Sequence, residues 1–168
     1  MFLALTLLLT SLATQTGSLT FTAPKEWKPR PPASSMRVAE FVVPKAQGDA
    51  EDAEAIVYFF GGTGGSVDAN VQRWIGQFDR AKDAPADGNR KTFSVGSLKV
   101  TTVDVSGTYI AEVRPGATER HNKHGFRMRA AVIETPKGPY FFRLVGPANT
   151  VKGASAAFDA FLQSLRFQ

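Results

Sequence analysis

Cysteine is absent from this 168-residue chain, and only two histidines occur. The absence of cysteine excludes a disulfide framework, a thiolate nucleophile, an iron–sulfur cluster, a Cys-ligated zinc and a lipid-modified N-terminal cysteine. Long apolar runs are scarce too. The longest has 11 residues, whereas a membrane-spanning helix needs about 20. We therefore expect a chain that does not span a membrane and that carries no metal or cofactor.

The longest apolar run lies at the N-terminus, from Phe2 to Leu12, and carries no charge. Its length is typical of the apolar region of a signal peptide, and small residues at Ser11 and Ala13 precede a possible cleavage site. No Lys or Arg precedes the run, which is atypical, and a buried first strand or helix is the alternative. The sequence predicts a signal peptide at residues 1–13 and a periplasmic or secreted domain at residues 14–168.

The rest of the chain has the composition of one globular domain, with 43% hydrophobic residues and 13 Phe. A chain of this length buries roughly 68–70% of its unfolded surface without staples. The net charge of +5 lies entirely outside the predicted signal peptide. A basic exported domain favours anionic partners such as lipid head groups, cell-wall polymers or acidic protein faces. We expect a monomer.

Alternating and β-branched segments predict a strand-rich fold. These segments cover residues 18–22, 37–43, 55–60, 92–95, 98 onward, 126–133 and 140–145. Residues 55–60 lack polar alternation, so this strand should be central and covered on both faces. Gly96-Ser97 and residues 135–139 should form the turns of two hairpins. After Leu98 the apolar positions change parity near Thr101 and Thr102, so we expect a β-bulge there. A strand buried on both faces is the alternative.

Two amphipathic helices are expected. The first covers residues 67–78 after an N-cap at Ser66, with Asn70, Arg73 and Gln77 on its polar face. The second follows a cap at Asn149 or Thr150, and Gly153 should weaken its first turn. Antiparallel hairpins with segregated helices define an α+β fold: an antiparallel sheet of about six to seven strands with one helix on each face, or both on one.

The sequence also predicts the environment of residues in two loops. Trp27 stands among four charged residues, so its rings should anchor the loop to the core while its N–H stays near water. The acidic residues between the second and third predicted strands should form a solvated turn: Asp49, Glu51, Asp52 and Glu54.

A glycine-rich loop, Gly61–Gly65, follows the strand at residues 55–60 and precedes the first helix. This order is typical of phosphate-binding loops, but no Lys follows the glycines and Asp68 would repel an anion. A tight turn is the simpler interpretation. The alternative is a weak anion pocket, of a small-ligand protein or of a weak hydrolase, formed by Gly62, Thr63, Gly64, Gly65, Ser66 and Arg73.

Catalytic motifs are missing. His121 and His124 lie in one loop with Glu119 as the nearest carboxylate, and zinc needs a third and usually a fourth ligand. We interpret both as solvated histidines at a hairpin tip. No Gly-x-Ser-x-Gly elbow occurs, so we predict no catalytic residue and no enzyme activity.

A basic cluster lies in the following segment. Between Arg114 and Arg129 the net charge is +4, carried by Arg114, Arg120, Lys123, Arg127 and Arg129 against Glu119. Arg127 and Arg129 share a strand face and should point to solvent. A positive hairpin can contact an anionic surface, and an ordinary solubilising face is the alternative. Aromatic residues do not interleave with these charges, so nucleic acid is an unlikely partner.

The two ends of the chain are similar to one known family. The ending YFFRLVGP with NTVKGASAAFDAFLQSLRF, and the opening LTFT with Pro24 and Trp27, resemble the PsbP/Mog-like superfamily. The segments EFVVP and YFFGGTGGSVDANVQRWIGQF look like those of exported bacterial proteins of unknown function. The resemblance covers about Leu19 to Phe167. It implies an antiparallel sheet between helices and a role in binding or stabilising other proteins, with no shared catalytic residues.

These observations predict an exported, non-catalytic domain that binds a protein partner or an anionic component of the envelope. The alternative is a small-ligand protein that uses the Gly61–Gly65 loop. A deep cavity at that loop, with Arg73 and a hydroxyl converging on it, would favour the alternative.

Overall fold

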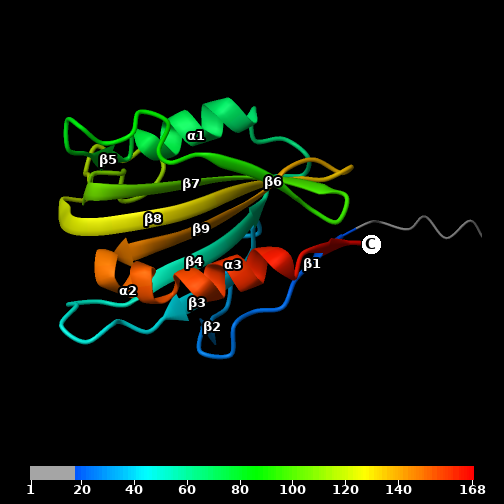
Figure 1. Cartoon of the computed structure of the whole chain (residues 1–168), viewed down its shortest axis with the longest axis horizontal. Helices are drawn as coiled ribbons and strands as arrows, with labels where there is room; N and C mark the ends of the chain where they lie inside the picture. Colours follow the sequence, from blue (N-terminus) through cyan, green and yellow to red (C-terminus); the bar gives the residue numbers. More distant parts are fainter. Residues whose placement is uncertain (1–17) are drawn as a thin grey trace, which may run out of the picture.

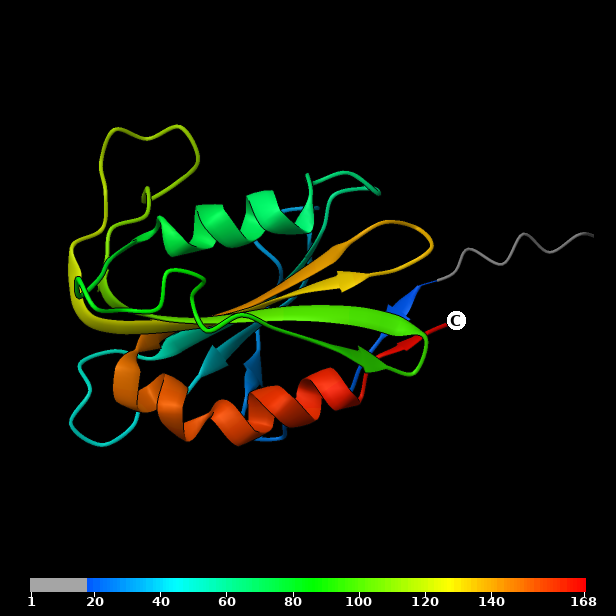
Figure 2. The ribbon, with the colours of Figure 1, turned by 45° about the horizontal axis from the view of Figure 1, so that its top comes forward.

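The computed structural model describes residues 18–168, so the predicted signal peptide lies outside the described residues. One large antiparallel sheet runs through the molecule, with a helix layer on each of its faces (Figures 1 and 2). Within residues 18–168 no helix is long and apolar enough to cross a membrane.

The large sheet has eight strands, and every pairing in it is antiparallel. Its order is β2 (Lys28–Pro29), β3 (Arg37–Val43), β4 (Ala53–Phe59), β9 (Tyr140–Pro147), β8 (Lys123–Glu134), β7 (Leu98–Tyr109) and β5 (Phe78–Asp79), and β6 (Lys91–Val95) also pairs with β7. The predicted α+β class and both predicted hairpins are confirmed. The strand expected at residues 18–22 is only β1 (Leu19–Thr20), which pairs with β10 (Arg166–Phe167) outside the large sheet.

The helices lie on opposite faces of this sheet (Figure 2). α1 (Val67–Ile75) covers one face, and α2 (Ala148–Gly153) and α3 (Ser155–Gln163) cover the other. Two hydrophobic cores result, one on each face, because β-strand side chains alternate between the two. Phe142 and Leu144 of β9 pack in the α3 core, whereas Phe141 packs in the α1 core.

The parity change in β7 comes from these two cores. Leu98 and Val100 pack in the α3 core, and Val103 and Val105 pack in the α1 core. The register between β7 and β8 is continuous from Lys99 to Gly107. The strand is therefore buried on both faces, and the bulge expected near Thr101 is not there. The register shifts only after Gly107.

Both predicted helices are shorter than expected. α1 ends at Ile75, before the C-cap Gly76, and Phe78 lies in β5 while still packing in the α1 core. The Ser66 hydroxyl caps α1 by accepting from the Ala69 N–H, as predicted. The C-terminal helix is broken into α2 and α3 at Ala154, directly after Gly153.

Three side chains lie deeper than the sequence indicates. Asn70 is fully buried rather than on a polar face, because its amide donates to the carbonyls of Gly64 and Ser66. Trp27 is 3% exposed, and its indole N–H is buried, with no hydrogen-bond partner among residues 18–168, rather than near water. Glu51 and Asp52 are exposed, as the predicted solvated turn requires, whereas Asp49 is half-buried and its carboxylate accepts from the Thr150 N–H and hydroxyl. It thereby replaces the predicted Asn149 or Thr150 cap on α2.

Candidate functional site

Helix α1 packs over β7 and β8 and leaves the neighbouring part of the same sheet face open. A groove of about 1120 Å³ lies there, between α1, strands β3, β4 and β9, and the loop of residues 110–121. We call it the sheet groove. Its lining includes Met36, Arg37, Glu54, Ile56, Tyr58, Phe60, Thr63, Gly64, Arg73, Gln77, Tyr109, Arg114, Arg120, His121, Phe141 and Arg143.

Two guanidinium groups face this groove from different elements. Arg143 comes from β9, and its Nη2 donates to the Gln77 Oε1 and to the Tyr109 hydroxyl, both at 3.2 Å. Its Nε is buried and has no hydrogen-bond partner among the described residues. Arg73 comes from α1 and donates to the Asn70 Oδ1 at 2.5 Å.

Neither arginine has a counter-ion. No carboxylate of residues 18–168 lies within ion-pair distance of Arg73 or Arg143, and residues 1–17 contain no acid. Burial lowers the pKa of Arg73, and the positive charge of Arg143 lowers it further. Arg73 is nevertheless exposed and Arg143 half-buried, so the two like charges act on each other across a groove that is open to solvent.

The acidic groups around the groove are already engaged. Glu54 pairs with Arg30, and Glu40 pairs with Arg30 and Arg37. The Glu112 carboxylate accepts from the Gly116 N–H at 2.8 Å and lies 3.8 Å from Arg120. The uncompensated charge in the groove is therefore positive.

The glycine loop forms a tight turn at one end of the groove. Gly61, Gly62, Gly64 and Gly65 all have φ between 66° and 123°, a region that favours glycine. A Cβ on Gly64 would lie 2.7 Å from the Phe141 ring. Of the predicted anion pocket, Thr63, Gly64 and Arg73 line the sheet groove, whereas Gly62, Gly65 and Ser66 do not.

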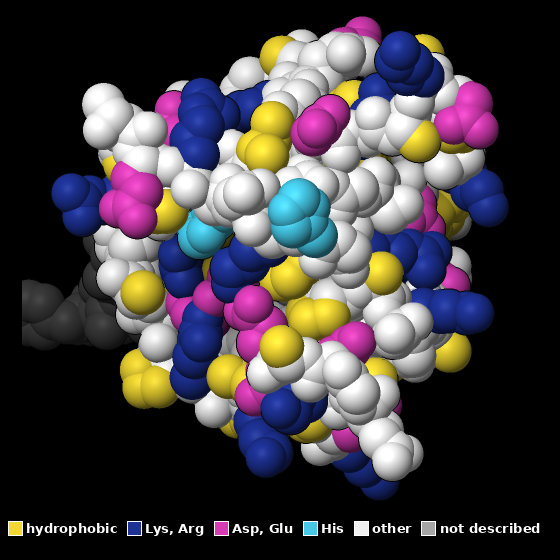
Figure 3. Space-filling model, turned by 90° about the vertical axis from the view of Figure 1, so that its left-hand side faces the viewer, with side chains coloured by type: hydrophobic (Ala, Val, Ile, Leu, Met, Phe, Trp, Pro, Cys, Tyr) yellow, Lys and Arg dark blue, Asp and Glu magenta, His cyan; other side chains and the backbone are white. Residues whose placement is uncertain are grey.

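The structure does not gather the basic cluster on one surface. Arg114 and Arg120 line the sheet groove. Arg127 makes two hydrogen bonds to Asp104, which raise its pKa, and Arg129 pairs with Asp159 on α3 and lies over the Phe158 ring at 4.5 Å. Both arginines thus lie on the α3 face rather than pointing freely to solvent. Basic and acidic side chains are intermixed in Figure 3.

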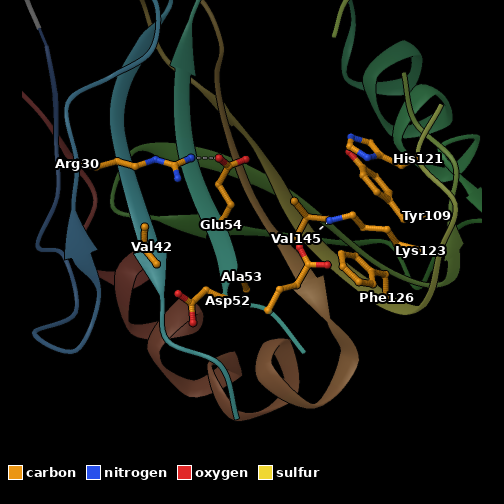
Figure 4. Close-up of a pocket in the computed structure, with 11 residues that line it drawn as sticks. Arg30, Val42, Asp52, Ala53, Glu54, Tyr109, His121, Lys123, Phe126 and Val145 are labelled. Carbon is orange, nitrogen blue, oxygen red and sulfur yellow. Dashed lines mark hydrogen bonds and ion pairs between the residues drawn. The ribbon is translucent and has the colours of Figure 1, made fainter. Parts of the chain in front are cut away.

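A smaller pocket of about 420 Å³ adjoins the sheet groove and shares Glu54, Tyr109 and His121 with it (Figure 4). Most of its charges are paired: Lys123 contacts Glu51 at 2.6 Å, and Arg30 reaches Glu54. Asp52 accepts a hydrogen bond from the Lys45 N–H. His121 is half-buried and stacks on Tyr109 with a centroid distance of 5.2 Å, so it is not a solvated tip residue.

A metal site is not formed by the histidines in the described part of the chain. His124 bonds through Nδ1 to the Thr108 hydroxyl at 3.0 Å, and no group of three His, Asp or Glu side chains gathers within residues 18–168. The polar residues that sequence reasoning missed are Arg143, Tyr109 and Gln77. Arg143 did leave a signal, because it interrupts the apolar strand YFFRLV.

No known family of proteins matches the chain, and a search of curated proteins finds no similar sequence.

Proposed function

We propose that this protein is a non-catalytic binding domain whose sheet groove takes an anionic ligand. The observation that carries the proposal is the pair Arg73 and Arg143, which face one groove without a carboxylate partner. Arg143 is half-buried, and a partly buried charge is costly unless an opposite charge compensates it. Arg73 is exposed and adds a second positive charge to the same groove. A bound anion would supply the opposite charge and would accept hydrogen bonds from both guanidinium groups.

Two residues of the basic cluster support the same proposal. Arg114 makes no ion pair within residues 18–168, and it lines the groove together with Arg120. Positive charge at the opening of a groove attracts anions over roughly 8–10 Å at physiological ionic strength. We propose that the protein is exported and that the ligand is an anionic component of the envelope. Membership of the PsbP/Mog-like superfamily is likewise a proposal, supported by the antiparallel sheet between helices.

Hydrolysis has less support than binding. The hydrogen bond between Thr108 and His124 joins a hydroxyl to an imidazole, but both residues lie outside the sheet groove. No carboxylate hydrogen-bonds to the His124 ring in the part of the chain that the structure describes. A nucleophile–base pair normally needs such an orienting group.

Titration followed by NMR chemical shifts tests the anion site. Inorganic phosphate, sulfate and acetate should shift amides near Arg73, Tyr109 and Arg143, and the binding should weaken as NaCl is added. Arg73→Gln and Arg143→Gln should each weaken binding at least tenfold. Arg166→Gln removes the same charge at an exposed site outside the groove and should bind like the wild type.

A thermal melt separates lost binding from lost folding. Arg73→Gln keeps an amide donor for Asn70 and removes the repulsion from Arg143, so its melting temperature should not fall. If no anion shifts the wild-type spectrum, or if Arg73→Gln binds every anion as the wild type does, the sheet groove is not an anion site.

A further inference from the structure

We infer that the ligand of the sheet groove is an amphiphilic anion, with its carboxylate or phosphate head at Arg73 and Arg143 and an apolar body along Tyr58 and Phe60. This inference rests on the proposed function, because it assumes that the two arginines bind the charged head. It adds the chemical class of the rest of the ligand and the direction in which the ligand lies along the groove.

The apolar part of the groove is built from half-buried aromatic side chains. Tyr58 projects from β4 and Phe60 from the residue directly after it, with ring centroids 5.9 Å apart and nearly parallel planes. The Phe60 ring centroid lies 5.5 Å from that of Phe141. Large aromatic residues gain most from complete burial. Two such rings beside an open groove of this size therefore form a surface that an apolar ligand can cover.

A methionine extends this apolar surface. Met36 is 50% exposed, and it and Val38 are the two exposed large hydrophobic residues of the described chain. Met36 lines the sheet groove, whereas Val38 does not. Methionine is flexible and polarizable, so it adapts to ligands of different shape.

The strand register orders the apolar and charged parts along the groove. Tyr58 lies opposite Phe141 in the pairing of β4 with β9, and Ile56 lies opposite Arg143. The aromatic rings therefore lie toward Phe60 and the glycine loop, and Arg143 follows at the level of Ile56. Arg37 lies opposite Tyr58 with its guanidinium 5.7 Å from the ring centroid, and its charge is paired with Glu40. Phe60 follows Ile56 by four residue steps, which at the rise of a strand corresponds to about 13 Å. A ligand with its head at Arg143 has that length of apolar groove for its body.

The groove's far end favours this orientation over the reverse one. Beyond Arg143 the next facing pair is Glu54 and Val145, and Glu54 also lines the adjoining pocket with its paired charges. An apolar chain directed there would meet carboxylates and ammonium groups. Directed toward Phe60, it covers aromatic rings.

A chain-length series tests this inference. We would titrate the purified protein with acetate, hexanoate and decanoate, and in parallel with methyl, hexyl and decyl phosphate, all below their micelle concentrations. Affinity should rise about fourfold for each buried methylene and level off once the chain exceeds the apolar length. The two series distinguish a carboxylate head from a phosphate head.

Variants locate the apolar body. Tyr58→Ser and Met36→Ser should reduce the gain from acetate to decanoate at least threefold while leaving acetate binding unchanged. Val38→Ser is the matched control, since Val38 is similarly exposed outside the groove. Arg73→Gln should weaken every member of both series.

The outcomes separate the two proposals. Binding that needs Arg73 but does not change with chain length would overturn the amphiphilic ligand and keep the anion site. A chain-length gain that survives Tyr58→Ser and Met36→Ser would also overturn it, because the body would then lie elsewhere. No binding by any member would overturn both proposals.

Discussion

Trp27 packs its indole against Phe41, Phe142 and Phe161, with ring centroids 6.0 to 6.1 Å away. Its charged neighbours in the sequence favour partial exposure, and by that pattern alone Trp27 would contribute less to stability than Trp74, which lies among the apolar residues of α1. The observed exposures, 3% for Trp27 and 1% for Trp74, remove that difference. At the scale of single residues, burial follows from what the loop packs against and not from the adjacent side chains.

We therefore predict that Trp27→Ala and Trp74→Ala destabilise the fold by similar amounts, about 3–5 kcal/mol each. Trp27→Phe should lose less than Trp27→Ala, because Phe keeps a ring and removes the unpartnered indole N–H. Urea unfolding of the three variants measures these differences. A loss below about 1 kcal/mol for Trp27→Ala would contradict its burial.

The two histidines give a second prediction at this scale. His121 is held by stacking on Tyr109 and His124 by the Thr108 hydroxyl. Neither contact needs a metal, so treatment with a chelator should leave the melting temperature unchanged. A fall of several degrees that added zinc reverses would show a structural metal instead.

Helix α2 shows how one element depends on a distant one. It has six residues and no capping side chain of its own, and the Asp49 carboxylate from the β3–β4 loop accepts from the Thr150 N–H at 2.8 Å. The Thr150 hydroxyl is the main cause of a lowered Asp49 pKa; burial opposes it, and the Thr150 N–H and Asn149 add to it. The loop and the helix therefore stabilise each other.

Asp49→Ala should lower the melting temperature by a few degrees, as the loss of a helix cap does. Asp83→Ala, an exposed acid in another loop, should not. Because the folded pKa of Asp49 lies below its ordinary value, its contribution is complete above that value and is lost as pH falls through the folded pKa. Melts between pH 7 and about pH 2 should thus show a shallower acid dependence for Asp49→Ala. Equal slopes for variant and wild type would assign the acid dependence to other carboxylates.

Glu40 should contribute to the same acid dependence. Burial raises its pKa, but hydrogen bonds from Arg37, the Ala33 N–H and Arg30 outweigh burial and leave the pKa below its ordinary value. Its stabilising effect is therefore also present near neutral pH and lost in acid.

For the whole molecule, the open question with the simplest test is where the mature chain begins. The apolar run from Phe2 to Leu12 predicts cleavage after Ala13, so the native protein should start near Thr14. N-terminal sequencing of protein from its own cells measures this directly. An intact Met1 in a soluble cytoplasmic fraction would contradict the export proposal. The experiments on the sheet groove would still test anion binding.

Several elements were determined by the sequence alone. The strand at residues 37–43, the Ser66 cap, the Gly96-Ser97 turn and the hairpin of β8 and β9 all follow from signals within a few residues of each other. Capping, turn conformation and side-chain alternation act locally, and for that reason they can be predicted from a short stretch of chain.

The candidate site was decided by the tertiary structure. Arg73 and Arg143 are far apart in the chain. They face one groove because β9 lies near the centre of the sheet, next to the part of the sheet face that α1 leaves uncovered. Tertiary structure also places the residues of the basic cluster on different surfaces. Side-chain alternation tells which residues share a strand face, but it does not tell which helix covers that face. Arg127 pairs with Asp104 and Arg129 pairs with Asp159, whereas Arg143 pairs with no carboxylate of residues 18–168. Whether a charged side chain finds an opposite charge depends on contacts between segments that are distant in the chain. Those contacts cannot be predicted from the residues next to it in the sequence.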